Sequence, residues 1–189
     1  MGEDKAKNSL DRQGEIMTNP TASFHPIKKA TAMIPQQLLG ELAVTRKFLE
    51  TSTAVLTEED SNFAPAEGVF TVAAQMAHIA ITIDWFVQGA FFRPQGFNLD
   101  FEADDRAARA FTSLAAARAA VARAFDNAAG VLAAQSAESL MIPLPNTGIM
   151  DGLPRGCIVG AIVDHTAHHR GALTVYARLL GRTPAMPYG

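Results

Sequence analysis

The residues in this chain that are best suited to chemistry are histidines, and three of its five lie in one short run. The run reads Asp164-His165-Thr166-Ala167-His168-His169-Arg170-Gly171. His165 and His169 are four residues apart, so on a helix their rings project from one face, with Cβ atoms about 5–6 Å apart. Two neutral imidazoles at that spacing can share one divalent metal ion. His78, in a separate apolar segment, is a candidate third ligand.

Each histidine also has a structural explanation. A single histidine on an apolar helix face is usually a core residue with satisfied ring nitrogens, and this is the simpler explanation for His78 alone. It is weaker for His165 and His169 together, because two stacked rings on a buried face both need partners and their charged forms are costly to bury. Spacing alone leaves both explanations open.

The neighbouring polar residues are assigned to other roles. His168 lies roughly 100° around the helix from His169, so we exclude it from the ligand set. Asp164 and His168 are four residues apart and are expected to form a pair at the surface or just outside the metal ligands. Arg170 is expected at a boundary between helices, with contact to a substrate anion as the alternative.

Helices are the elements that must position these residues, because apolar residues recur at helical spacing in four segments. We expect helices from near Pro35 to about Leu56, over Thr71–Phe92, from near Thr112 to about Leu132, and from Pro154 to Leu180. A polar link is expected over 95–105 and an irregular loop over 143–154. Four long amphipathic helices predict an all-α antiparallel four-helix bundle.

The same periodicity suggests which residues surround a metal. Trp85 follows His78 by seven residues and Tyr176 follows His169 by seven, so both can line a pocket beside the histidines. Ordinary core packing is the alternative for both residues, and it is the simpler explanation for Trp85.

Composition limits the domain count and the partners. The chain has 189 residues, of which 48% are hydrophobic and 19% charged, and we expect a flexible N-terminal tail over 1–31 followed by one helical domain over 32–189. A net charge of −3 gives no reason to expect nucleic acid. The single cysteine, the absence of a secretory signal and the polar residues within the longest apolar segment predict a soluble, cytoplasmic protein with no membrane span.

The stretches Val72–Ala80, His165–Gly171 and Val175–Pro184 resemble the DinB-like (DinB/YfiT) metalloenzyme superfamily, and the resemblance covers residues 34–184. It implies a four-helix bundle in which His78, His165 and His169 hold one divalent metal ion, typically zinc or nickel. It also implies a homodimer and a reaction involving a low-molecular-weight thiol, either its transfer or an isomerisation that depends on it. Ala172 departs from the family's usual glutamine.

Three functions follow as alternatives. The first is a metal-dependent, thiol-dependent transferase that acts on a small-molecule substrate. The second is a metal-dependent hydrolase, which is less favoured because no acidic residue stands at helical spacing from His165 or His169 on the inward face. The third is a non-enzymatic, metal-stabilised module for binding or stress response.

Overall fold

The four long helices expected from the sequence are present in the computed structural model, which describes residues 35–188. They are α1 (Pro35–Thr53), α2 (Val72–Val87), α4 (Leu114–Ala133) and α6 (Ile158–Leu179). Helix α2 continues through a π-helical turn, Gln88–Phe92, so the whole segment follows the predicted course. The described residues contain no strand, only an isolated bridge between Pro143 and Pro154. The all-α four-helix bundle is confirmed.

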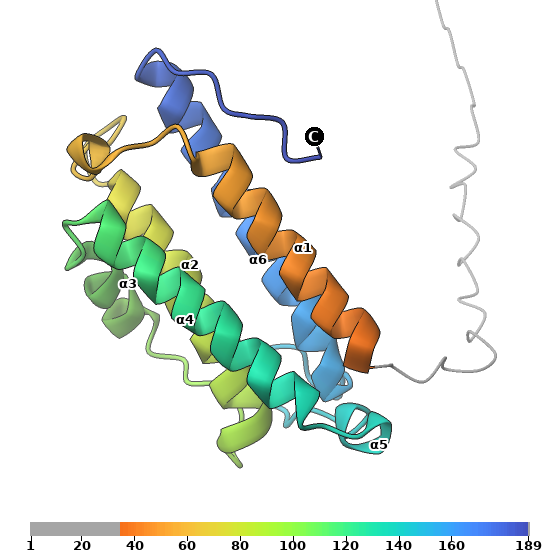
Figure 1. The fold of residues 1–189 in the computed structure, drawn as a ribbon. Helices are drawn as coiled ribbons and strands as arrows, with labels where there is room; N and C mark the ends of the chain where they lie inside the picture. Colours follow the sequence, from red (N-terminus) through yellow and green to blue (C-terminus); the bar gives the residue numbers. More distant parts are fainter. Residues whose placement is uncertain (1–34, 189) are drawn as a thin grey trace, which may run out of the picture. The chain divides into compact units, whose positions relative to one another are not determined.

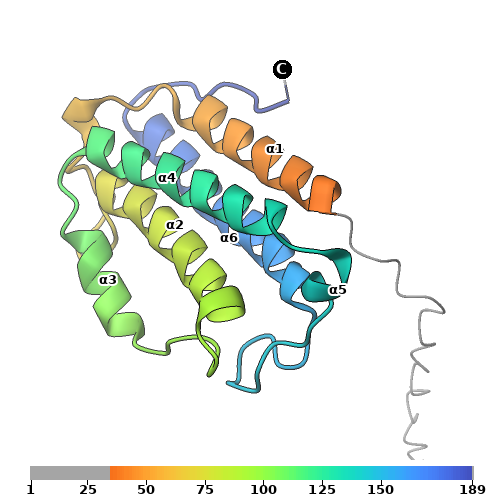
Figure 2. The same cartoon turned by 60° about the horizontal axis from the view of Figure 1, so that its bottom comes forward.

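Two of the long helices run each way (Figure 1). Helices α1 and α6 run side by side in one direction, while α2 and α4 run side by side in the other. The parallel course of α2 and α4 requires a return connection between them. Helix α3 (Phe101–Arg109) supplies it, lying along α2 before α4 begins (Figure 2). The bundle is therefore antiparallel between its two pairs and parallel within each pair.

Helix α3 occupies a segment that the sequence pattern predicted to be largely a polar link. The Asp100 side chain caps its start by accepting from the Ala103 N–H at 3.0 Å. An ion pair one turn apart, Asp105 with Arg109 at 2.7 Å, supports the helix from its surface. Only Ala108 is fully buried, so α3 has almost no apolar stripe from which periodicity could predict it.

Other short elements complete the described chain. They are two 3₁₀ turns, η1 (Glu58–Asp60) and η3 (Arg155–Cys157), and the single-turn helix α5 (Ala137–Leu140). Pro154 precedes η3 and does not enter the first turn of α6 as predicted. The start of α2 agrees with its sequence, because the Thr71 hydroxyl accepts from the Ala74 N–H at 3.1 Å. Gly181 follows α6 with a φ of 76°, a left-handed conformation that favours glycine at this position.

Large aliphatic side chains from the four long helices and their connections form the core. Those that are almost completely buried are Leu42, Leu49, Leu56, Met76, Ile79, Ile83, Leu114, Leu132, Leu140, Ile158, Ile162 and Leu173. On α6 the buried positions recur at three and four residues, as predicted, and they include His169. None of the helices within residues 35–188 has the length and apolar character needed to cross a membrane.

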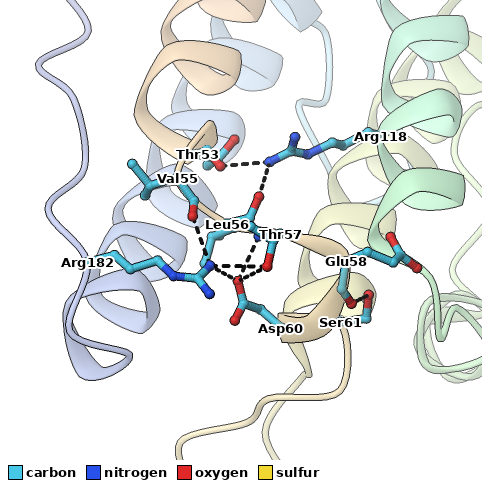
Figure 3. Close-up of polar contacts among 9 residues, drawn as sticks. All are labelled: Thr53, Val55, Leu56, Thr57, Glu58, Asp60, Ser61, Arg118 and Arg182. Atoms are coloured by element: carbon cyan, nitrogen blue, oxygen red, sulfur yellow. Dashed lines mark hydrogen bonds and ion pairs between the residues drawn. The ribbon is translucent and has the colours of Figure 1, made fainter.

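A polar network fastens the turn after α1 to the ends of α4 and α6 (Figure 3). Arg182 donates to the Val55 carbonyl at 2.9 Å and pairs with Asp60, a buried carboxylate. From α4, Arg118 donates to the Thr53 carbonyl at 2.7 Å. These arginines satisfy carbonyls that the end of a helix leaves without partners. They fix the end of α1 against both neighbouring helices.

Candidate metal centre

Three histidine side chains meet between α2 and α6. His78 comes from α2, and His165 and His169 come from successive turns of α6. The His165 Nε2 atom lies 3.2 Å from Nε2 of His78 and 3.0 Å from Nε2 of His169. All three candidate ligand atoms lie within 4.8 Å of one another. One nitrogen from each ring therefore faces a common point, as the ligands of one metal ion must.

Packing between α2 and α6 creates this convergence. The i,i+4 spacing places His165 and His169 on one face of α6, and α2 packs against that face. His169 is 9% exposed, while His78 and His165 are half-buried. The site thus lies at the edge of the core, with one histidine inside and two toward the surface.

Burial keeps the three rings neutral. It is the main cause that lowers the pKa of His165 to about 4 and that of His169 to about 3, and the neighbouring histidines lower both further. Burial also lowers the pKa of His78, against the opposing charges of Asp105 and Asp104. Neutral imidazoles offer a lone pair to a metal, whereas protonated ones do not.

Gln75, three residues before His78 on α2, supports the site and was not among the site residues predicted from the sequence. Its side chain is 6% exposed and contacts Nδ1 of His169. For His169 to present a lone pair at Nε2, its Nδ1 must carry the proton and needs an acceptor. The amide oxygen of Gln75 provides that acceptor when the amide is turned so that the oxygen faces the ring.

The donor set fits a divalent metal ion. Three neutral histidines suit zinc, nickel, copper or iron, and they leave other coordination positions for water or substrate. Nδ1 of His78 is buried and has no hydrogen-bond partner among the described residues. This atom is therefore not satisfied by the surrounding described protein, unlike Nδ1 of His169, which contacts Gln75.

His168, Asp164 and Arg170, the polar residues near the predicted ligands in sequence, lie outside the histidine cluster. His168 is exposed, and its ring packs edge-on against that of His169 at 4.8 Å without joining the cluster. Asp164 is exposed and forms no hydrogen bond or ion pair with His168. The Arg170 guanidinium lies over the Phe48 ring of α1, 5.5 Å from its centroid, so it sits at the boundary between α1 and α6.

Trp85 and Tyr176 differ in their relation to the centre. Trp85 lines a pocket of about 400 Å³ that also contains His78 and His165. Tyr176 does not line this pocket. It is 8% exposed, and its hydroxyl donates to the Phe70 carbonyl at 3.2 Å. Since Phe70 is a wall residue of the pocket, Tyr176 holds that wall in place from behind.

The pocket beside the histidines also contains carboxylates that the sequence pattern did not place there. Its lining residues are Phe70, His78, Thr82, Trp85, Phe101, Asp104, Asp105 and His165. Asp104 and Asp105 come from α3, which lies next to α2. The acidic residues and the adjacent Asp100 cap were the available signals for this helix. Their position against α2 depends on the return connection, which spacing within one helix does not reveal.

The sequence and the fold both resemble those of known proteins. The model of the DinB family matches residues 20–189. A DinB-like protein from Bacillus cereus ATCC 10987 shares the fold with a TM-score of 0.64 and 20% identity, over 80% of this chain and 95% of its own. No curated protein matches the sequence.

A second solved structure is YfiT from Bacillus subtilis, described as a probable metal-dependent hydrolase with an unusual four-helix bundle topology. It matches with a TM-score of 0.62 and 15% identity, over 87% of this chain and 97% of its own. At these identities, both solved structures establish the likeness of the fold.

Proposed function

Because this chain belongs to the DinB family, we propose that it is a metal-dependent enzyme of the thiol-dependent transferase type, with one divalent ion held by His78, His165 and His169. The observation that carries the proposal is the convergence of three Nε2 atoms at the edge of a pocket. His78 and His165 both line that pocket, so a small molecule inside it can reach the point where the nitrogens meet.

The groups around this point have different proposed roles. A divalent metal, zinc or nickel in our proposal, would supply a Lewis acid that lowers the pKa of a coordinated thiol. With its amide oxygen facing Nδ1 of His169, Gln75 would keep the proton on that atom and leave Nε2 available as a ligand. The rings of Phe70, Trp85 and Phe101 form apolar walls against which a substrate can pack.

Hydrolysis is the second candidate, and α3 provides the observation that favours it. Asp104 and Asp105 line the pocket, and a carboxylate there can accept a proton from an attacking water molecule. The sequence argument against hydrolysis considered only acidic residues at helical spacing from the histidines, so it does not apply to these two. The description of YfiT as a probable metal-dependent hydrolase points the same way.

A purely structural metal is the third alternative. Structural metal sites are normally closed by protein ligands, whereas this cluster has three histidines and borders a pocket. That arrangement supports an enzyme with a small-molecule substrate. On the family resemblance alone, we also propose that the chain forms a homodimer.

The test assays purified protein for both thiol conjugation and hydrolysis. Metal-loaded and chelated samples are assayed with a panel of thiols and chlorodinitrobenzene, in which a C–S bond forms, chloride leaves with the C–Cl electron pair, and the thiol proton passes to buffer. Parallel samples receive ester and amide substrates. We expect metal-dependent conjugation, and its loss in the His165→Ala variant. Metal-dependent hydrolysis without conjugation would transfer the assignment to the hydrolase, and inactivity toward both classes would contradict the enzyme proposal.

A further inference from the structure

The pocket beside the histidine cluster is lined by both aromatic and acidic side chains. Three of its lining residues are aromatic, namely Phe70, Trp85 and Phe101, and two are acidic, Asp104 and Asp105. None of its lining residues is lysine or arginine. Aromatic faces carry partial negative charge, so these rings and carboxylates together attract a cation to the part of the pocket away from the histidines.

The two carboxylates are not equivalent. Asp105 accepts from Nε of Arg109 at 2.7 Å, and the same guanidinium donates to the Gly68 carbonyl at 2.9 Å and covers the Phe70 ring at 4.5 Å. Arg109 is therefore fully engaged and balances Asp105. Asp104 forms no ion pair or side-chain hydrogen bond among the described residues. Within residues 35–188, it is the lining carboxylate that has no ion-pair partner.

The position of the aromatic wall is well defined. Trp85 stacks on Phe97 with ring centroids 4.5 Å apart, and its indole N–H donates to the Asn98 carbonyl at 2.6 Å. The indole is fixed before any ligand arrives, and indole is the aromatic group that binds cations best. Asp104, Asp105 and His78 line the same pocket, so the field of the two carboxylates extends to its histidine end.

We propose that the molecule taken by this pocket carries an ammonium group, and that Asp104 binds this group with help from the aromatic wall. Another group of the same molecule then lies toward His78 and His165. Where that second group is identified as a thiol, the inference rests on the proposed function. Asp104 thus acts as a specificity-determining residue, on a helix that contributes no metal ligand.

A matched pair of thiols tests the proposal through binding rather than turnover. Thiocholine carries a quaternary ammonium that cannot chelate metal, and 3,3-dimethylbutane-1-thiol is its uncharged isostere. Each is titrated into the full-length, cobalt-loaded protein, and the thiolate-to-cobalt absorption band gives the dissociation constant. Because the two thiols differ in acidity, the informative quantity is the change in each constant when Asp104→Asn is introduced.

The control is Glu102→Gln, which removes the same charge from the same helix at a side chain that is 92% exposed and outside the pocket. We expect Asp104→Asn to weaken thiocholine binding about fivefold to tenfold, with the isostere unchanged and Glu102→Gln without effect on either. Equal losses for both thiols, or equal effects of the two variants, would overturn the assignment of Asp104. Metal content and circular dichroism establish that each variant is folded and loaded.

A second arm separates this inference from the thiol chemistry. Trp85 is the only tryptophan of the chain, so its fluorescence reports on the pocket directly. Choline, which has the cation but no thiol, should change this fluorescence in the wild type and in Glu102→Gln, and much less in Asp104→Asn. If neither thiol alters the cobalt band while choline behaves in this way, the thiol proposal fails and the cation site stands. If choline has no effect on the wild type, the cation site fails.

Discussion

At the scale of single residues, the chemistry of the site depends on which ring nitrogens are free. His165 and His169 share a face because they are one turn apart, while the adjacent His168 points to solvent. Burial makes the charged forms of His165 and His169 unfavourable, so both rings are neutral at physiological pH. With its amide oxygen turned toward the ring, Gln75 would hold the proton of His169 on Nδ1. Helical spacing thus decides which rings face the site, burial keeps them neutral, and the Gln75 contact bears on where the proton of His169 lies.

Replacing Gln75 should weaken metal binding without unfolding the protein. In Gln75→Leu the Nδ1 proton of His169 loses its acceptor, and we expect metal affinity to fall about 10–100-fold. Gln75→Glu keeps an acceptor at the same place and should restore most of the affinity. Competition with a chromophoric chelator measures both constants. Wild-type affinity in Gln75→Leu would show that this contact does not support the ligand.

The metal-free protein should lose stability as the pH falls below about 6.5. The folded chain holds the pKa of His165 at about 4 and that of His169 at about 3, whereas the ordinary value is 6.5. The unfolded chain therefore binds more protons below that value, and the free energy of unfolding decreases as the pH drops toward about 3.

Urea unfolding of chelated protein between pH 7 and pH 5 measures this slope, in a range where most carboxylates are still ionised. His165→Asn should show a shallower slope because it removes one of the three histidines whose pKa burial lowers, and His168→Ala should keep the wild-type slope. A stability that is constant over this range in the wild type would contradict the expected burial of neutral histidines.

At the scale of elements, the pocket depends on the segment that joins α2 to α4. The π-helical turn at the end of α2 contains Gly89, and a Cβ atom there would lie 2.1 Å from the Phe97 ring. Glycine therefore allows Phe97 to pack against the helix, and Phe97 in turn supports Trp85 by stacking. The chain then enters α3 and brings Asp104 to the pocket.

A methyl group at position 89 should disturb this arrangement. We expect Gly89→Ala to lower the free energy of unfolding by about 1–3 kcal/mol, because the Phe97 ring must move. Gly130→Ala is the matched control within α4, where nothing lies within 4 Å of the new Cβ, and it should raise stability by up to about 1 kcal/mol. Chemical denaturation compares the two. If both variants gained stability, the close packing at Gly89 would be wrong.

The sequence predicted the elements that have strong periodicity and missed those that do not. The apolar spacing along α1, α2, α4 and α6 identified all four, and the predicted start of α2 at Thr71 agrees with the Thr71 cap in the structure. Helix α3 was missed because its surface is mainly charged and its position depends on contact with α2. The pair His165 and His169 could be predicted from spacing within one helix, α6. The carboxylates of the pocket could not, because they come from a different helix, α3, whose position depends on contact with α2.

At the scale of the whole molecule, the direction of the helices decides what the site contains. Because α2 and α4 run parallel, the chain must return along α2 between them. This return brings Asp104 and Asp105 of α3 into the pocket that His78 and His165 line. A simple up-and-down order would need only a short turn there. The DinB family match over residues 20–189 spans the entire described bundle and extends into the predicted N-terminal tail.

The predicted tail, residues 1–31, lies outside the described residues and is tested by deletion. Its sequence lacks a helical apolar period, so it has little surface to bury and should contribute little to stability. We expect a chain beginning at residue 32 to keep its thermal midpoint and its capacity to bind metal. Because the family match begins at residue 20, a second deletion of residues 1–19 serves as the control. A large loss confined to the longer deletion would show that residues 20–31 belong to the domain.

The central claim, that His78, His165 and His169 hold one metal ion, is tested most directly by metal stoichiometry in matched alanine variants. Elemental analysis after equilibration with zinc or nickel should give one ion per chain for the wild type and for His168→Ala. It should give essentially none for His165→Ala, whose Nε2 lies within 3.2 Å of both other ligand atoms. Full occupancy in His165→Ala, or loss in His168→Ala, would contradict the account.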